Sequence, residues 1–395
     1  MTDYFTLSLD AHRKTHGKWE MRSKFPVTTQ AELSIAYTPG IAAVSQRLSR
    51  HPEEAYNLSM KGNSVAIVSD GSAVLGLGDI GPEGALPVME GKAILLKALA
   101  GVDGIPIVIN AKEPAEIIQI VKAIAPTFGG INLEDIKAPK CFEIESALQD
   151  IGIPVFHDDQ HGTAIVLYAA LLNACKITGK HFENLKVVIN GAGAAGAAVA
   201  KLLKGIGQNG DVKPVKDVIL CDTKGIISRS RDDLNPSKLQ MLEFTNFTNQ
   251  NGTVFDALKD ADVFVGVSAA NLLKADDVRV MARDSIIFGL ANPIPEIMPA
   301  EALAAGAKVV GTGRSDFPNQ VNNALAFPGI FRGALDAKAS RITEKMKLRA
   351  AKALAELITN PTPEKILPHV LDPHVAETIA KAVKDTAIEE GVSRL

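Results

Sequence analysis

The sequence predicts an α/β protein built from two parallel sheets and a helical tail. Between residues 65 and 156, short apolar runs alternate with helix-like stretches, which is the pattern of a parallel sheet covered by helices. After a long helix-like stretch, the same alternation starts again at residue 186 and continues to 311. From Ala334 onward the chain is rich in Ala, Lys, Glu and Leu, which favour helix. We therefore expect an N-terminal parallel α/β domain over residues 1–160 and a second α/β domain over 161–395 that includes the tail.

Each apolar run is interpreted as a buried strand. In the first domain the expected strands cover 65–68, 105–109, 129–133 and 153–156. The helices expected between them cover 92–99, 115–125 and 141–149. Thr163 is a suitable cap for a helix that runs to Thr178 and ends at Gly179, and this helix would join the two domains. In the second domain the expected strands cover 186–190, 218–221, 263–267, 286–289 and 308–311. The helical tail is expected to pack back on the first domain.

Length and composition narrow the class of protein. A chain of 395 residues with 46% apolar residues can form two or three compact units. No apolar run approaches the roughly 18 residues of a membrane span, and the N-terminus lacks the pattern of a signal peptide. A net charge of −3 with interspersed signs argues against a nucleic-acid surface. The three widely spaced cysteines form no disulfide framework. We expect a cytoplasmic protein that acts on a small molecule, with no membrane or nucleic-acid partner.

Two acidic pairs follow two of the expected strands. Glu134 and Asp135 come after the run at 129–133, while Asp158 and Asp159 come after the run at 153–156. Since parallel strands end at the same edge of a sheet, both pairs should meet where ligands bind. Crowded carboxylates suit a hard divalent cation such as Mg²⁺ or Mn²⁺.

Two other interpretations of this segment remain open. Acidic residues are common in the loops after strands, so either pair could be solvated and without function. His157 and His161 lie four residues apart, which is a spacing that zinc ligands adopt on a helix. A helix is not expected at this point, because His157 closes a strand and the next helix is expected to begin near Gly162 and Thr163.

The chain contains two matches to the pattern G-x-G-x-x-G. The first, at 76–81, is followed by Pro82, Gly84 and Pro87, which oppose an immediate helix and favour a loop. The second follows a strand and opens into a helix, as in dinucleotide-binding domains. Its cofactor-binding residues would be Gly191, Gly193, Ala194, Ala195 and Gly196. The alternative is a glycine-rich packing contact between helix and strand with no ligand.

The strand at 218–221 ends at Asp222, which could accept hydrogen bonds from the adenosine ribose. Its charge favours NAD over NADP. Lys224 could partly neutralise a 2′-phosphate, so NADP remains possible. The stretch at 207–216 is interpreted as an inserted turn.

Together with these motifs, the chain resembles the malic enzymes from Tyr37 to Gly329. The matching segments are Tyr37-Thr-Pro-Gly-Ile-Ala, the loop at 76–81, Glu90-Gly-Lys92, Asn132-Leu-Glu-Asp-Ile, Asp158-Asp-x-x-Gly-Thr-Ala, the loop at 191–196, Ala291-Asn292-Pro and Asn322-Asn323-x-x-x-Phe-Pro-Gly329. The resemblance implies an N-terminal substrate and metal domain followed by a Rossmann-type NAD(P)-binding domain. It also implies a homodimer or a larger homo-oligomer.

The resemblance also implies roles for individual residues. Tyr37 would be the catalytic acid and Lys92 the base, with Asp158 as the partner of the lysine. Glu134, Asp135 and Asp159 would bind the metal. Asn292 and Asn323 would lie near the substrate and the nicotinamide, and Lys92 would also contact the substrate. These assignments fit the chemistry, because oxidation of a 2-hydroxy acid requires a base and protonation of the carbon left after CO₂ loss requires an acid.

Two departures from the family pattern are evident. Longer members have a substrate-binding arginine where this chain has Ser72-Ala73-Val74, so another residue must hold the second carboxylate. The chain also ends without the additional C-terminal domain of some bacterial members, so we expect the compact form.

The expected activity is metal-dependent oxidative decarboxylation of L-malate to pyruvate and CO₂ with reduction of NAD(P). A malolactic reaction, which yields lactate with bound NAD, is the first alternative. A zinc hydrolase that uses His157 and His161 and a non-catalytic nucleotide sensor are alternatives of other classes.

Overall fold

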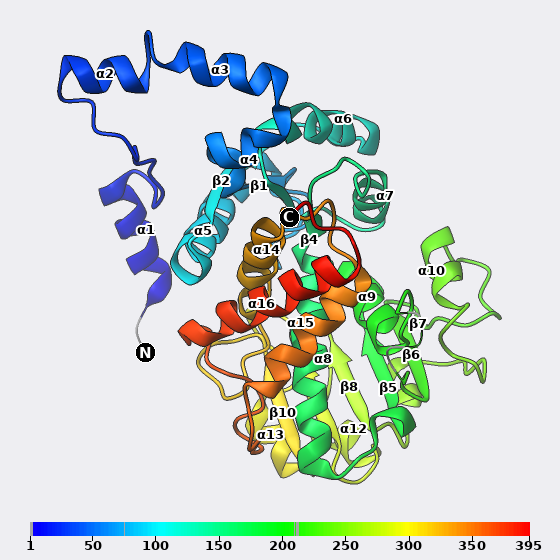
Figure 1. Ribbon diagram of the computed structural model, residues 1–395. Helices are drawn as coiled ribbons and strands as arrows, with labels where there is room; N and C mark the ends of the chain where they lie inside the picture. The colour runs from blue at the N-terminus through cyan, green and yellow to red at the C-terminus, as the bar shows by residue number, and fades with distance from the viewer. Residues whose placement is uncertain (1–2, 75, 209, 211–212) are drawn as a thin grey trace.

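The computed structural model describes residues 3–74, 76–208, 210 and 213–395, and it confirms the predicted fold class. Two separate sheets lie one above the other along the molecule in Figure 1, joined by the long helix α8 (Asp158–Thr178). All the predicted strands are present, with ends shifted by one or two residues. The turn interpreted at 207–216 lies partly outside the described residues.

The first sheet has four parallel strands in the order β2-β1-β3-β4. They are β1 (Ser64–Ser69), β2 (Asp103–Val108), β3 (Gly130–Leu133) and β4 (Val155–His157). The helices between and beside them are α4 (Ala55–Leu58), α5 (Gly81–Ala100), α6 (Pro114–Ile124) and α7 (Lys140–Ala147). Every residue of β1, β3 and β4 is buried, as expected for a sheet covered on both faces.

The second sheet has six strands in the order β10-β9-β8-β5-β6-β7, and only β7 is antiparallel. The strands are β5 (Lys186–Asn190), β6 (Asp217–Asp222), β7 (Gly225–Ile226), β8 (Val263–Gly266), β9 (Ile286–Gly289) and β10 (Val309–Thr312). The helices of this part are α9 (Ala194–Leu203), α10 (Pro236–Met241), α11 (Val254–Leu258), α12 (Ala275–Arg279) and α13 (Pro299–Ala304).

Two predicted helix starts are wrong. Helix α8 begins at Asp158 rather than at Thr163, because the chain passes from β4 into the helix through His157 without a loop. Asp158 and Asp159 then lie in the first turn, where the helix dipole favours negative charge. Helix α5 begins directly at Gly81, although Pro82, Gly84 and Pro87 had favoured a loop. Pro82 lies in the first turn, where a backbone N–H has no intrahelical acceptor, so proline costs no hydrogen bond there.

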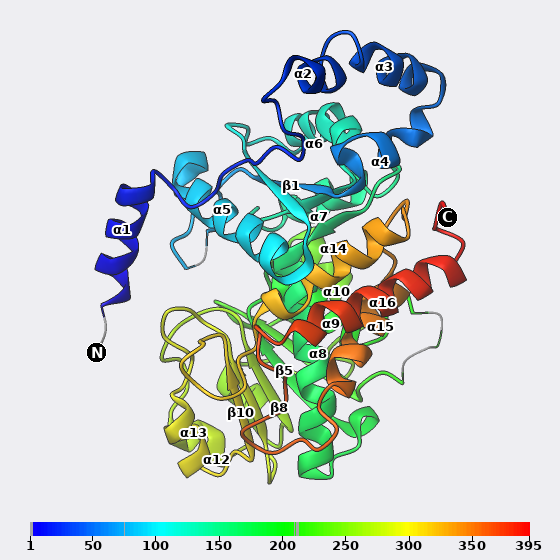
Figure 2. The same cartoon turned by 60° about the vertical axis from the view of Figure 1, so that its left-hand side comes forward.

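The C-terminal tail packs back on the first domain, as predicted. It comprises α14 (Phe327–Asp336), α15 (Glu344–Glu356) and α16 (Pro373–Glu389). Helices α14 and α16 contact α5, and α15 contacts α8, in front of which α15 and α16 lie in Figure 1. Figure 2 shows the same helices from a second side. The ring of Phe331 meets that of Phe156 edge-on at 5.9 Å, and Nη1 of Arg332 donates to Oδ1 of Asn63 at 2.6 Å. One continuous core therefore includes residues from both sheets and the tail.

The N-terminal segment contrasts with this body. Its helices α1 (Tyr4–Thr15), α2 (Gln30–Ala36) and α3 (Ile41–Arg50) contain no buried residue. They form an arm along the edge of the first domain in both views. Large apolar side chains are exposed along it, namely Tyr4, Phe5, Leu7, Leu9, Met21, Phe25, Val27, Leu33, Ile35, Tyr37 and Ile41. We call residues 3–50 the N-terminal arm. Among the described helices, none is long and apolar enough to cross a membrane.

Helices α14 and α16 approach closely through glycine. A Cβ placed on Gly333 would lie 2.4 Å from the carbonyl oxygen of Ala380, and one on Gly329 would lie 2.7 Å from Cβ of Ile379. Both distances are too short for a side chain to fit without movement of α16.

We predict that Gly333→Ala lowers the melting temperature. Alanine should favour the helix by about 1 kcal/mol, but overpacking costs about 1–3 kcal/mol and should outweigh that gain. Gly91→Ala in α5 is the matched control, because its Cβ would meet only the end of the Lys18 side chain, at 3.8 Å. Differential scanning calorimetry of both variants tests this, and a Gly333→Ala protein at least as stable as the control would contradict the packing argument.

Candidate active site

The register of β3 and β4 brings the two acidic pairs together. Leu133 pairs with His157 at the carboxyl end of both strands, so Glu134 and Asp135 leave the sheet beside Asp158 and Asp159. Asp135 has a positive φ of 54°, an uncommon conformation outside glycine, and its amide donates to Oδ2 of Asp159 at 2.8 Å. The predicted meeting of the acidic pairs at one sheet edge is therefore observed.

Lys92 reaches this edge from α5. Its Nζ lies 3.0 Å from Oε1 of Glu134, forms an ion pair with Asp158, and lies 4.6 Å above the ring of Phe327. The lysine is only 8% exposed. Asn132 supports the pair by donating to Oε2 of Glu134 at 2.8 Å.

Burial and charge shift the pKa values of these groups in opposite directions. Burial tends to lower the pKa of Lys92, but the carboxylates of Asp158, Glu134 and Asp159 outweigh it and hold that pKa above the ordinary value. Burial raises the pKa of Glu134 and of Asp158 to about 7 against the opposing charge of the lysine. Within this cluster a single lysine faces several buried carboxylates, so negative charge is in excess.

The geometry of three of these carboxylates fits a divalent cation. Glu134, Asp135 and Asp159 each offer an oxygen, and these oxygens lie within 4.8 Å of one another. All three residues are at the sheet edge, and Asp159 also lines a cavity of about 520 Å³. Hard oxygen donors together with an excess of buried negative charge suit Mg²⁺ or Mn²⁺.

The cavity lies between the two domains and includes several predicted residues. From the first domain it is lined by Asp135, Lys137 and Asp159. From the second domain its wall contains the predicted cofactor and substrate residues Gly193, Ala194, Ala195, Asn292 and Asn323. The acidic edge and the glycine loop therefore face one space that is large enough for small ligands.

The glycine loop has the close approaches of a dinucleotide-binding turn. Gly191 has a φ of 124°, and a Cβ on Gly196 would lie 1.8 Å from the carbonyl oxygen of Gly191, so the helix can pack on the strand only through glycine. Nothing lies within 4 Å of the corresponding position on Gly193, which faces the cavity. Gly191 and Gly196 thus allow the tight turn, and the open space beside Gly193 leaves room for a phosphate at the start of α9.

Asp222 ends β6 as predicted, but its carboxylate already has partners. Arg231 donates to both of its oxygens at 2.8 and 3.0 Å, and Nζ of Lys238 lies 2.6 Å from Oδ2. These bonds hold the pKa of Asp222 below its usual value, although burial acts to raise it. Lys224, predicted to neutralise a 2′-phosphate, instead pairs with Asp233 at 2.8 Å.

Tyr37 is not brought to the site within this chain. It caps the end of α2 on the N-terminal arm, its side chain is 67% exposed, and it lines none of the larger described cavities. The predicted acid and the predicted base therefore lie on different parts of the molecule.

The place of the missing arginine is filled by a hydrogen-bonded turn. Oγ of Ser72 donates to Asp70 at 2.6 Å and accepts from the amide of Lys137 at 3.0 Å. Lys137 is among the residues that line the cavity, and within the described part of the chain its side chain makes no ion pair.

His157 and His161 do not converge on a zinc site. His161 lies in the first turns of α8 and its Nε2 bonds Glu145, whereas His157 is fully buried at the end of β4. Burial lowers the pKa of His157 to about 4, so it is a neutral core residue. Neither belongs to the groups of possible metal ligands found in the described part of the chain.

Two supporting residues were missed by sequence reasoning. A Cβ on Gly162 would lie 1.9 Å from Oδ1 of Asp158, so only glycine leaves that carboxylate in place. Glu296 is fully buried and accepts from the amides of Ser268 and Ala291, which fixes the loops after β8 and β9. Gly162 could have been predicted from its place in the Asp-Asp-x-x-Gly motif. Glu296 could not, because nothing in the sequence distinguishes it from other glutamates in loops.

Both halves of the chain match family models of known protein domains. The family model for the malic enzyme N-terminal domain matches residues 16–115 and 111–149, and the model for the malic enzyme NAD-binding domain matches 160–388. A bifunctional malic/malolactic enzyme of Bacillus subtilis is 52% identical over 392 residues, covering 98% of this chain and 94% of that protein. An NAD-dependent malic enzyme of Geobacillus stearothermophilus is 53% identical over 381 residues, covering 96% and 78%.

A solved structure of a malic enzyme has the same fold over nearly the whole chain. The crystal structure of the NAD-dependent malic enzyme of Thermotoga maritima superposes with a TM-score of 0.91 at 48% identity, covering 97% of this chain and 99% of that one.

Proposed function

The chain belongs to the malic enzyme family, and on that premise we infer that it oxidises and decarboxylates L-malate to pyruvate and CO₂ with reduction of NAD(P). The observation that best supports this activity is the buried cluster of Lys92 with Glu134 and Asp158 beside the glycine loop. We propose that residues 1–160 form the substrate and metal domain and that 161–395 form the NAD(P)-binding domain with its tail.

We propose Lys92 as the base, with Asp158 holding its Nζ toward the substrate hydroxyl. Glu134, Asp135 and Asp159 would hold Mg²⁺ or Mn²⁺, which when bound supplies charge that stabilises a developing negative charge on the substrate oxygen. Lys92 must be neutral to act as a base. The carboxylates of Asp158, Glu134 and Asp159, with no cation bound to them, raise its pKa and keep it protonated. Positive charge held by the same carboxylates would oppose that effect, so the lysine can lose its proton only when the cluster is neutralised.

The nucleotide would lie along the glycine loop, with Asn292 and Asn323 near its nicotinamide. We propose that NAD is preferred, because the Asp222 carboxylate stands at the end of β6. Arg231 and Lys238 already neutralise that carboxylate, so NADP should also be accepted.

The activity is tested with malate, Mn²⁺ and each nucleotide, by the ultraviolet absorbance of the reduced nicotinamide. The Bacillus subtilis relative is named as both malic and malolactic, which favours the malolactic reaction as the second candidate. Lactate formed without net reduced nicotinamide would identify it.

We predict that Asp159→Asn reduces both Mn²⁺ affinity and turnover. The loss in affinity should exceed the roughly 10–100-fold that follows removal of an outer hydrogen-bond partner, since Asp159 would be a direct ligand. Asp150→Asn, an exposed acid beyond α7, is the control. Near-normal turnover of Asp159→Asn with an ordinary Mn²⁺ dependence would refute the metal assignment.

The second carboxylate of malate needs a cation, and we propose Lys137 in place of the missing arginine. It lines the cavity two residues beyond Asp135, on the first-domain side. The nearby Lys140 and Lys112 are already paired with Asp70 and Asp79. Lys137 is therefore the cation of this segment that is available to a substrate.

Lys137→Met should raise the KM for malate by about tenfold or more, because a hydrogen bond to a charged group contributes roughly 1.5–3 kcal/mol. The KM for NAD should change little. Lys122→Met, an exposed lysine on α6, serves as the control. An unchanged KM for malate in Lys137→Met would show that another group binds the second carboxylate.

We propose that Tyr37 acts in the site of a second subunit. The N-terminal arm exposes a long series of apolar side chains and buries none of its helical residues, which is unusual for a monomer in water. A cytoplasmic homodimer or larger assembly that covers the arm would bury these side chains. It could also place Tyr37 near the Lys92 of the neighbouring copy, where the acid is needed.

Mixing of variants tests this arrangement. Tyr37→Phe and Lys92→Ala should each be nearly inactive, but after joint refolding about a quarter of the wild-type activity should return, because half of the dimers are mixed and each has one complete site. The double variant mixed in excess with wild type should instead suppress activity. If both residues act within one subunit, the single variants will not complement and the double variant will not suppress.

A further inference from the structure

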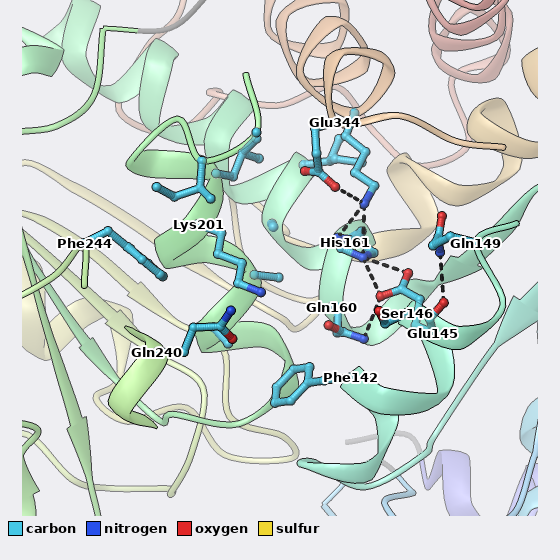
Figure 3. Close-up of a pocket in the computed structure, with 18 of the residues that line it drawn as sticks. Phe142, Glu145, Ser146, Gln149, Gln160, His161, Lys201, Gln240, Phe244 and Glu344 are labelled. Atoms are coloured by element: carbon cyan, nitrogen blue, oxygen red, sulfur yellow. Dashed lines mark hydrogen bonds and ion pairs between the residues drawn. The ribbon is translucent and has the colours of Figure 1, made fainter. Parts of the chain in front are cut away.

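Glu145 of α7 is a buried carboxylate that forms hydrogen bonds with the start of α8. It is 8% exposed and forms one wall of an interdomain cavity of about 590 Å³, which is distinct from the one lined by the glycine loop. Figure 3 shows it joined to Gln160 and His161, while Lys201 and Gln240 lie across the cavity.

Within the described residues, the donors to Glu145 come from the end of β4 and the first turns of α8, where Asp158 and Asp159 lie. The amide of His157 donates to Oε1 at 3.1 Å, and Nε2 of Gln160 donates to Oε2 at 3.1 Å. Nε2 of His161 lies 2.8 and 2.9 Å from the two oxygens. Residues 157, 160 and 161 flank Asp158 and Asp159, so this single carboxylate holds both sides of the acidic pair.

The hydrogen bonds of Glu145 cap helix α8 from outside the helix. Its N-cap residue is His157, whose side chain makes no capping hydrogen bond. In a capping box, a glutamate in the first turn of the helix accepts from the N-cap amide. Glu145 performs that function from a neighbouring helix, and it also fixes the peptide that leads into Asp158.

The network continues into the C-terminal tail. Nζ of Lys347 lies 3.2 Å from both nitrogens of His161 and 2.6 Å from Oε1 of Glu344. Burial acts to raise the pKa of Glu145, but His161 and Lys347 outweigh it and bring that pKa to about 2. Glu145 is thus a charged group at neutral pH, and the lysine that lowers its pKa is Lys347 of α15 rather than Lys92.

We propose that Glu145 is a positioning residue that sets the orientation of Asp158 and Asp159 and thereby the affinity of the site for its divalent cation. This proposal rests on the metal site of the proposed function. Outer hydrogen-bond partners of metal ligands typically change metal affinity by about 10–100-fold, and Glu145 would act one step further out, through the backbone of α8.

The test is direct Mn²⁺ binding, measured by the electron paramagnetic resonance signal of free Mn²⁺, without turnover. Glu145→Ala should weaken Mn²⁺ binding by about tenfold or more, whereas NADH affinity, measured by fluorescence, should stay near wild type. Glu145→Gln retains an acceptor for the His157 amide and should restore most of the affinity. Glu143→Gln, an exposed acid on the same helix, is the matched control.

The outcomes separate the two proposals. Wild-type protein that binds no Mn²⁺ would refute the metal site itself. Wild-type protein that binds Mn²⁺ with the same affinity as Glu145→Ala would overturn the positioning role alone. A parallel loss of Mn²⁺ affinity, NADH affinity and melting temperature would also overturn it, since that pattern is general destabilisation. If Glu145→Ala does not fold, His161→Gln replaces it, with a smaller loss of Mn²⁺ affinity expected and equal affinity counting against the proposal.

Discussion

The pairing of Leu133 with His157 is the constraint from which the site follows. A shift of one residue in this register would turn alternate side chains to the other face of the sheet and would separate the two acidic pairs. With the register fixed, Glu134 and Asp158 come close enough to share one lysine. Lys92 compensates part of the charge of these buried carboxylates, and the negative charge that remains is the basis of the proposed cation site.

The second domain is arranged around the same edge. Its glycine loop and the loops after β8 and β9 close the other side of the cavity, and Glu296 fixes two of those loops by accepting their amides. A nucleotide on the loop would lie directly opposite the acidic edge. The acidic edge and the glycine loop thus belong to two different sheets, which α8 joins, with Asp158 and Asp159 in its first turn.

The sequence was sufficient for the parts of the structure that depend on local pattern. Buried strands are apolar runs, the glycine loop is a contiguous motif, and acids after parallel strands must converge. Nine of the ten described strands and the meeting of the two acidic pairs were therefore predictable, whereas the two-residue strand β7 was not. The start of α8 was not, because the cap that permits an immediate helix is Glu145, a residue distant in sequence. The partners of Asp222 are likewise nonlocal, since Arg231 and Lys238 reach it from beyond the strand. The exposure of Tyr37 depends on how the N-terminal arm leaves the body, which no local pattern encodes.

The return of the tail to the first domain has a consequence for how the chain reaches this structure. Phe156 and Asn63 obtain their partners Phe331 and Arg332 only after the whole second domain has been made. A ribosome releases the chain from its N-terminus, so β1 to β4 emerge while one face still lacks its cover. That face would remain open to chaperones or to other nascent chains until residues 327–394 arrive. Completion of the first domain is in this sense the last event of synthesis, and truncation near the C-terminus would damage the half of the protein that is translated first.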